Sequence, residues 1–126
     1  MYWFSVSVAL LAALGIIAIG VMYLSSPRAA TLSFGLPLPE EGPNIAWWLR
    51  LKGVRDVVSG LVLIALMAWG GPRMLGLVLL IEAIIPVGDM SLILAAKGST
   101  VRALGIHGLT AALMILAAIP LMTGAA

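Results

Sequence analysis

Residues 52–60 read KGVRDVVSG, and they open an apolar run that continues to Trp69. Lys52, Arg55 and Asp56 therefore bring three ionisable side chains into a segment whose surroundings are otherwise apolar. Charged side chains within a bilayer are costly, so they face the interior of a helical bundle, where they pair with one another or serve a function. This stretch predicts a membrane helix and also the region in which a functional site should lie.

The composition indicates an integral membrane protein. Of the 126 residues, 63% are hydrophobic and 10% are charged, whereas soluble domains carry about 25% charged residues. The formal net charge of +2 is small and spread along the chain, which argues against a nucleic-acid partner. There are no cysteines and only one histidine, His107, so a structural zinc site and a cysteine nucleophile are not expected.

Four apolar runs are each long enough to cross a bilayer as a helix, which takes about 20 residues. Their approximate bounds are residues 4–24, 45–69, 72–96 and 100–122. Residues 25–44 contain four prolines, and proline lacks the backbone donor that a helix needs, so this segment is predicted to be a loop. The expected fold class is all-α: an integral membrane four-helix bundle that forms a single domain over residues 1–126.

The charge distribution suggests an orientation in an inner or plasma membrane. Arg28, Lys97 and Arg102 lie in or near the two connections on one side of the expected bundle, and Arg73 lies on the other side. Positive charge gathers on the cytoplasmic side, so both termini are predicted to lie outside. The first apolar run lacks a positively charged start and is longer than the core of a signal peptide, so we expect it to be retained; cleavage near residues 25–30 is the alternative.

Polar side chains from the last three helices are predicted to meet in one half of the bilayer. Counted at 1.5 Å per residue, the depth is roughly 10 Å for Lys52, Asp89 and His107 and roughly 15–21 Å for Arg55, Asp56 and Glu82. On helical angles, residues 52, 55, 56 and 59 share one arc, residues 82 and 89 share one stripe, and residues 107 and 114 share another. Polar faces turn away from lipid, so we expect one polar chamber inside the bundle.

This chamber contains the groups that acid–base catalysis requires. Glu82 is the expected general acid, because it lies deepest and no cation lies one helical turn away. Asp56, oriented by Arg55, or Asp89 is the expected base, and His107 completes the hydrogen-bond network. Four side chains are expected to contact the substrate: Lys52, Arg55, Ser59 and Met114. Neither a metal ion nor an organic cofactor is required.

Purely structural interpretations stay open for most of these residues. Arg55 and Asp56 could form an ion pair that joins helices, and Lys52 could extend toward the lipid headgroups. Asp89 could bond to a helix end or to Lys97, and His107 could have a packing role. Glu82 is the hardest to explain in this way, because an isolated deep carboxyl group in a membrane is functional by default. The glycines of the opening stretch, Gly53 and Gly60, remove bulk where a neighbouring helix or a ligand would come close.

The motif Lys-Gly-x-Arg-Asp at residues 52–56, followed by Gly60, Glu82, Asp89 and the pair His107-Gly108, resembles a family of small four-span membrane proteins catalogued only as a domain of unknown function. The resemblance covers the second to fourth helices, about 70 residues. More loosely, the architecture is similar to that of small integral-membrane cyclases, isomerases and epoxide hydrolases. That similarity implies acidic residues that protonate an alkene or an epoxide inside a helical bundle.

Two classes of function follow from these observations. The first is an intramembrane enzyme that uses acid–base chemistry on a small lipophilic substrate, for example in epoxide opening, isomerisation or cyclisation. The alternative is a small proton-coupled transporter or ion-conducting oligomer, since titratable groups at several depths are also what a proton relay needs. Four short helices enclose little volume, so the alternative predicts at least a homodimer. An accessory subunit whose charges meet a partner's helices is a third possibility.

Overall fold

The computed structural model describes residues 1–125, and every regular element within them is helical. The elements are α1 (Tyr2–Ser25), α2 (Pro27–Thr31), α3 (Ile45–Trp69), α4 (Pro72–Glu82), α5 (Ile84–Ala95), α6 (Thr100–Arg102), the π-helix η1 (Ala103–Gly108) and α7 (Leu109–Thr123). The predicted all-α class is therefore confirmed, and the predicted second helix has the expected bounds.

Three helical segments are long and apolar enough to cross a membrane: α1, the segment Pro72–Ala95 formed by α4 and α5, and the segment Thr100–Thr123 formed by α6, η1 and α7. The helix α3 is just as long, with 25 residues, but its first half carries the charged stretch described above. Apolar helices of this kind fit a lipid bilayer.

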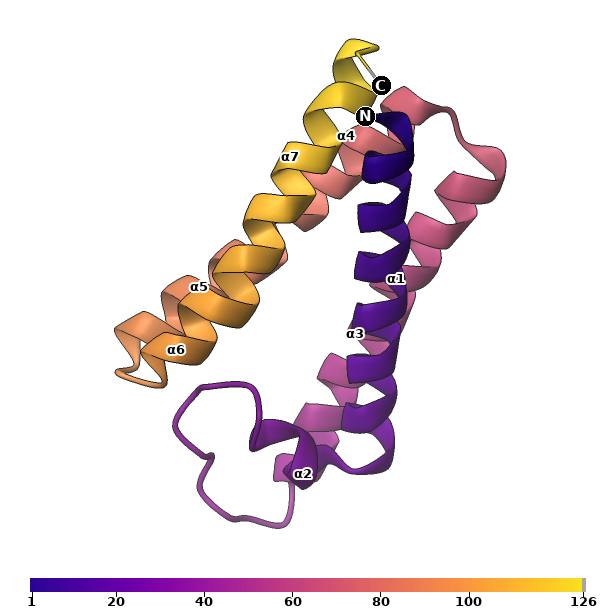
Figure 1. The fold of residues 1–126 in the computed structure, drawn as a ribbon. Coiled ribbons are helices and arrows are strands. Elements are labelled where there is room, and N and C mark those ends of the chain that lie inside the picture. Colours follow the sequence, from indigo (N-terminus) through magenta and orange to yellow (C-terminus); the bar gives the residue numbers. More distant parts are fainter. Residues whose placement is uncertain (126) are drawn as a thin grey trace.

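The helices are arranged as two antiparallel pairs that meet at one end and diverge at the other (Figure 1). In one pair α1 runs along α3, and in the other α4 and α5 run along α7 and η1. Both termini lie at the end where the pairs meet, and a buried apolar core fills that end. Its members come from α1, α3, α4 and α7 and from the residue between α4 and α5: Ala9, Ala13, Leu63, Leu75, Leu79, Ala83, Met114, Ala117, Ala118 and Leu121.

Glycines hold α1 and α3 in close contact. A Cβ atom at Gly20 would lie 2.8 Å from the carbonyl oxygen of Gly53, and one at Gly60 would lie 2.6 Å from the carbonyl oxygen of Ala13 and would overlap the side chain of Ile17. Small residues at such crossings let backbones approach closely. The close approach expected at Gly53 and Gly60 is therefore made by the first helix.

The helix predicted over residues 72–96 is interrupted at Ala83, which separates α4 from α5. The cause lies at Pro86, which has no N–H to donate to the carbonyl oxygen of Glu82, four residues earlier. The predicted helix is therefore present as one segment, Pro72–Ala95, with a local break in its regular hydrogen bonding at Ala83. The interruption lies directly beside Glu82, at the level where the two helix pairs begin to diverge.

The helix predicted over residues 100–122 also departs from regular α-helix. Residues 103–108 form a π-helix, in which the backbone N–H of Leu109 reaches the carbonyl oxygen of Leu104, five residues earlier. Single π turns inside helices are rare and occur often at functional sites. This one carries His107.

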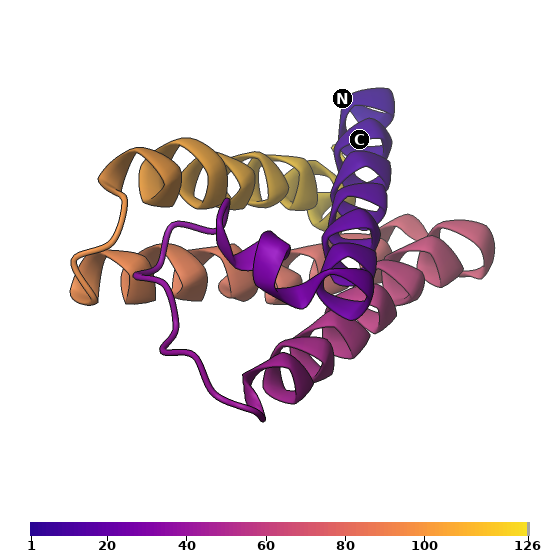
Figure 2. The same cartoon turned by 90° about the horizontal axis from the view of Figure 1, so that it is seen from below.

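The segment predicted to be a loop, residues 25–44, contains the short helix α2, which begins at Pro27 because proline is tolerated in a first helical turn. The rest of the segment crosses from α2 toward α6 and returns to α3 (Figure 2). The Arg102 guanidinium donates to the Leu32 carbonyl (2.9 Å), and the Ser99 backbone N–H donates to the Gly35 carbonyl (2.8 Å). Gly35 has a φ of +112°, a conformation that favours glycine. The loop is thus bound to the far helix pair.

The glycine contact predicts that Gly60→Ala destabilises the fold. The added methyl group would collide with the α1 backbone at Ala13, and overpacking of this kind lowers the free energy of unfolding by about 1–3 kcal/mol. Thermal unfolding in detergent measures the effect. Gly15→Ala is the matched control, because a Cβ atom there meets nothing within 4 Å. Equal melting temperatures for the two variants would contradict the close α1–α3 contact.

Candidate functional site

A cavity of about 440 Å³ lies where the two helix pairs diverge, and the loop borders its open end. Most of its lining is apolar and comes from α1, α5 and α7. The lining also includes a few polar side chains: Tyr23, Ser33, Lys52, Ser59, Glu82, Asp89, His107 and Thr110. A mostly apolar cavity of this size with a few converging polar groups is the usual form of a small-molecule site.

Lys52 lies at the loop end of this cavity. Its ammonium nitrogen is 2.6 Å from the carboxylate of Asp56, one helical turn further along α3. The same nitrogen lies 4.3 Å from the centroid of the Tyr23 ring and 5.1 Å from that of Phe34. A carboxylate and two aromatic faces stabilise a cation in surroundings with little water. The Lys52 side chain is 33% exposed, so the ammonium group keeps access to the cavity.

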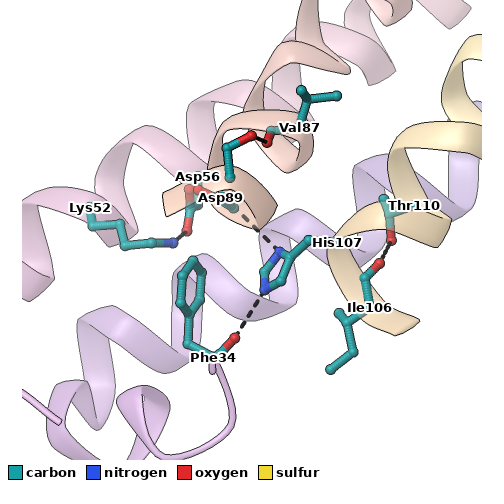
Figure 3. Close-up of polar contacts among 9 residues, drawn as sticks. Phe34, Lys52, Asp56, Val87, Asp89, Ile106, His107 and Thr110 are labelled. Carbon is teal, nitrogen blue, oxygen red and sulfur yellow. Dashed lines mark hydrogen bonds and ion pairs between the residues drawn. The ribbon is translucent and has the colours of Figure 1, made fainter. Parts of the chain in front are cut away.

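His107 joins the loop to the opposite helix pair (Figure 3). Its Nε2 lies 3.0 Å from the carbonyl oxygen of Phe34, and its ring lies 4.7 Å from the Phe34 ring. A carbonyl oxygen can only accept, so Nε2 must carry a hydrogen. The other nitrogen, Nδ1, faces the Asp89 carboxyl group, with Oδ2 at 3.7 Å.

The orientation of His107 dictates how it interacts with Asp89. With a hydrogen on Nε2, a neutral imidazole turns the lone pair of Nδ1 toward the carboxyl group. The contact is favourable when one proton resides between the two groups, on Nδ1 or on Asp89. His107 and Asp89 therefore face each other across 3.7 Å at the loop end of the cavity.

Glu82 lines the cavity further in, close to the interruption between α4 and α5. Its carboxyl group is half-buried, and the nearby polar group is the hydroxyl of Ser59 on α3. No cation forms an ion pair with Glu82 among residues 1–125. Glu82 is thus the one cavity carboxyl group without a charged partner in the described chain.

Six of the eight predicted site residues line this one cavity: Lys52, Ser59, Glu82, Asp89, His107 and Met114. Asp56 is buried just behind the lining and contacts it through Lys52. Arg55 is exposed, and it forms no ion pair with Asp56 within the described residues. The expected orientation of Asp56 by Arg55 is therefore replaced by Lys52, because residues four apart share a helix face and adjacent residues do not.

Two residues of the site were not anticipated from the sequence. Tyr23 ends the first helix and Phe34 lies in the loop, and both rings flank the Lys52 ammonium group. The sequence does show an aromatic residue, Phe34, among the prolines of the loop. A loop residue has no helical periodicity, however, so its position in the sequence could not assign it to the site. Within residues 1–125 no three His, Asp or Glu side chains are grouped closely enough to hold a metal ion.

Comparison with known proteins assigns the chain to a family. No curated protein and no solved structure matches the chain. One family model does match, described as Domain of unknown function (DUF4267), and the match extends over residues 13–121, which include every cavity residue discussed above except those near the start of α1. The resemblance drawn from the sequence to a family of unknown function is thereby confirmed, and the chain belongs to the DUF4267 family.

Proposed function

We propose that this protein is an intramembrane enzyme that acts on a small lipophilic molecule by acid–base chemistry. The observation that carries the proposal is the cavity itself. Glu82, which has no ion pair within the described residues, and the facing pair of Asp89 and His107, which could share one proton, border one apolar space. Acid and base groups held apart in one water-poor site are the usual requirement for proton transfer to and from a bound substrate.

The expected topology places this cavity within the bilayer. In this proposal α3 is a fourth span beside the three apolar segments, and both termini lie outside with the loop in the cytoplasm. Lys52 and Asp56 form an ion pair, and Asp89 faces His107, so most of the charged groups of the cavity have a partner of complementary chemistry. A substrate dissolved in the membrane would then meet an apolar cavity lined by α1 and α7.

Epoxide opening is a reaction that these groups suit. The carboxylic acid of Glu82 would give its proton to the epoxide oxygen while the carbon–oxygen bond breaks. A water molecule would attack the carbon as the ring opens, and its proton would pass through further water in the cavity to the Asp89–His107 pair, which lies two helical turns nearer the loop, roughly 10 Å away. The product is a vicinal diol. Isomerisation or cyclisation would use the same acid, with the pair removing a proton from carbon instead of from water.

The packing of the half of the bundle that contains the termini favours this proposal over the proton-coupled transporter or ion-conducting oligomer. A transport path would need polar groups between the cavity and the end where the termini lie. That half contains the apolar core formed by α1, α4 and α7, including Ala13, Leu79 and Ala117. A one-sided pocket fits an enzyme better than a conduction path.

Glu82→Gln tests the general acid. The amide keeps the size of the side chain but cannot deliver a proton, so we expect turnover of lipophilic epoxides by the purified protein in detergent to fall by about 100-fold or more. Product diols are measured by mass spectrometry. Glu40→Gln, the same change on an exposed loop carboxylate, is the matched control and should retain wild-type turnover. If wild-type protein opens no epoxide but moves protons across proteoliposomes, the transporter alternative is correct.

The Asp89–His107 pair is tested by Asp89→Asn, His107→Gln and the double variant. Glutamine retains an N–H donor for the Phe34 carbonyl but cannot carry the shared proton. Each single change should lower kcat by about 100-fold. Since the two groups act as one unit, the double variant should be no slower than the slower single variant. If the loss of kcat in the double variant equals the product of the two single losses, the two side chains act independently.

A further inference from the structure

The polar groups of the cavity lie at two levels, separated by the same number of residues on two antiparallel helices. The loop-end level contains Lys52 on α3 and Asp89 on α5, with His107 beside them. The middle level contains Ser59 on α3 and Glu82 at the end of α4. Each helix places its two cavity residues seven positions apart, which is two turns or roughly 10 Å along the axis.

The lining between and around these levels is apolar and continuous. Ile85 and Pro86 lie between the two acidic residues, and Ile16 and Ile19 face them from α1. Beyond the middle level, Leu63 and Met114 close the cavity at the packed core. With a volume of about 440 Å³ and this length, the space suits one extended chain.

The charges at the loop-end level select an uncharged polar group. Lys52 is offset by Asp56 at 2.6 Å, and the Asp89 carboxyl group faces the His107 ring, so each charged group of this level already has a partner. A carboxylate entering this level would lie beside two carboxyl groups, which costs free energy. A hydroxyl group avoids this, because its oxygen can accept from the Lys52 ammonium and its hydrogen can be donated to Asp89.

We propose that the substrate is a single-chain lipophilic alcohol whose hydroxyl group binds at Lys52 and Asp89 and whose reacting oxygen function lies roughly 10 Å further along the chain, at Glu82 and Ser59. This inference rests on the proposed function and adds to it the class of substrate and the spacing between its two polar groups. In this arrangement Lys52 binds and positions the substrate, and Glu82 contacts the reacting atoms.

The first experiment compares turnover of hexadecanol derivatives that carry one epoxide near the hydroxyl, at the middle of the chain or near its far end. The mid-chain isomer should have the highest kcat/KM, by about tenfold, because only this isomer fills both levels at once. Replacing the hydroxyl by a carboxylate or by a methyl group should lower kcat/KM by a similar factor. Equal turnover of all isomers and all end groups would overturn the inference while leaving the proposed function intact.

The variant Lys52→Gln tests the contact between the ammonium group and the substrate hydroxyl. It should lower kcat/KM for the mid-chain epoxy alcohol by about tenfold more than it lowers kcat/KM for the epoxide that ends in a methyl group, because only the alcohol loses a hydrogen bond to the ammonium group. A loss that is equal for both substrates would mean that Lys52 only supports the fold.

A binding measurement tests the same inference without turnover. The mid-chain diols of hexadecanol should stabilise the protein in detergent against thermal unfolding more than plain hexadecanol does, and Lys52→Gln should remove part of that difference. If no epoxide is opened but this binding preference is found, the two-level site stands and the proposed reaction fails. If neither preference is found, the inference itself is wrong.

Discussion

The hydrogen bond between His107 and the Phe34 carbonyl is the contact on which the cavity depends. It joins residues 73 positions apart and ties the loop to the π-helix of the opposite helix pair. It also determines which nitrogen of the imidazole faces Asp89, since the carbonyl oxygen accepts only from a protonated Nε2. One backbone carbonyl thereby helps to hold the loop at the end of the cavity and orients the imidazole toward Asp89.

The cavity exists because the two helix pairs pack tightly at one end only. Glycine contacts bring α1 and α3 together along their length, while the small residues Ala117 and Ala118 let α7 enter the core near the termini. Beyond that level, Pro86 interrupts the regular hydrogen bonding of the third segment beside Glu82. The same local change that separates α4 from α5 therefore places a carboxyl group at the inner part of the opening.

Sequence reasoning predicted the helices and most of the cavity because both depend on local periodicity. Depth and helical angle grouped Lys52, Ser59, Glu82, Asp89 and His107, since a helix converts sequence spacing into position along and around one axis. The partner of Asp56 was misjudged, since adjacent charges look like a pair in sequence although Lys52, one turn away, shares its face. Phe34 and Tyr23 were missed because a loop path and a ring contact between elements have no sequence period.

The distribution of charge is the reason for which we propose Glu82 as the general acid. Lys52 is occupied by Asp56 at 2.6 Å, and His107 is oriented toward Asp89, so each of these carboxyl groups already has a basic partner. Glu82 has a hydroxyl group, Ser59, as its nearby polar neighbour and apolar side chains around it. Apolar surroundings and the absence of an ion pair within the described residues are the features that distinguish Glu82 from the other carboxyl groups of the site. In our proposal the paired carboxyl groups at the loop end therefore belong to the level that binds the substrate, and Glu82 belongs to the level that reacts.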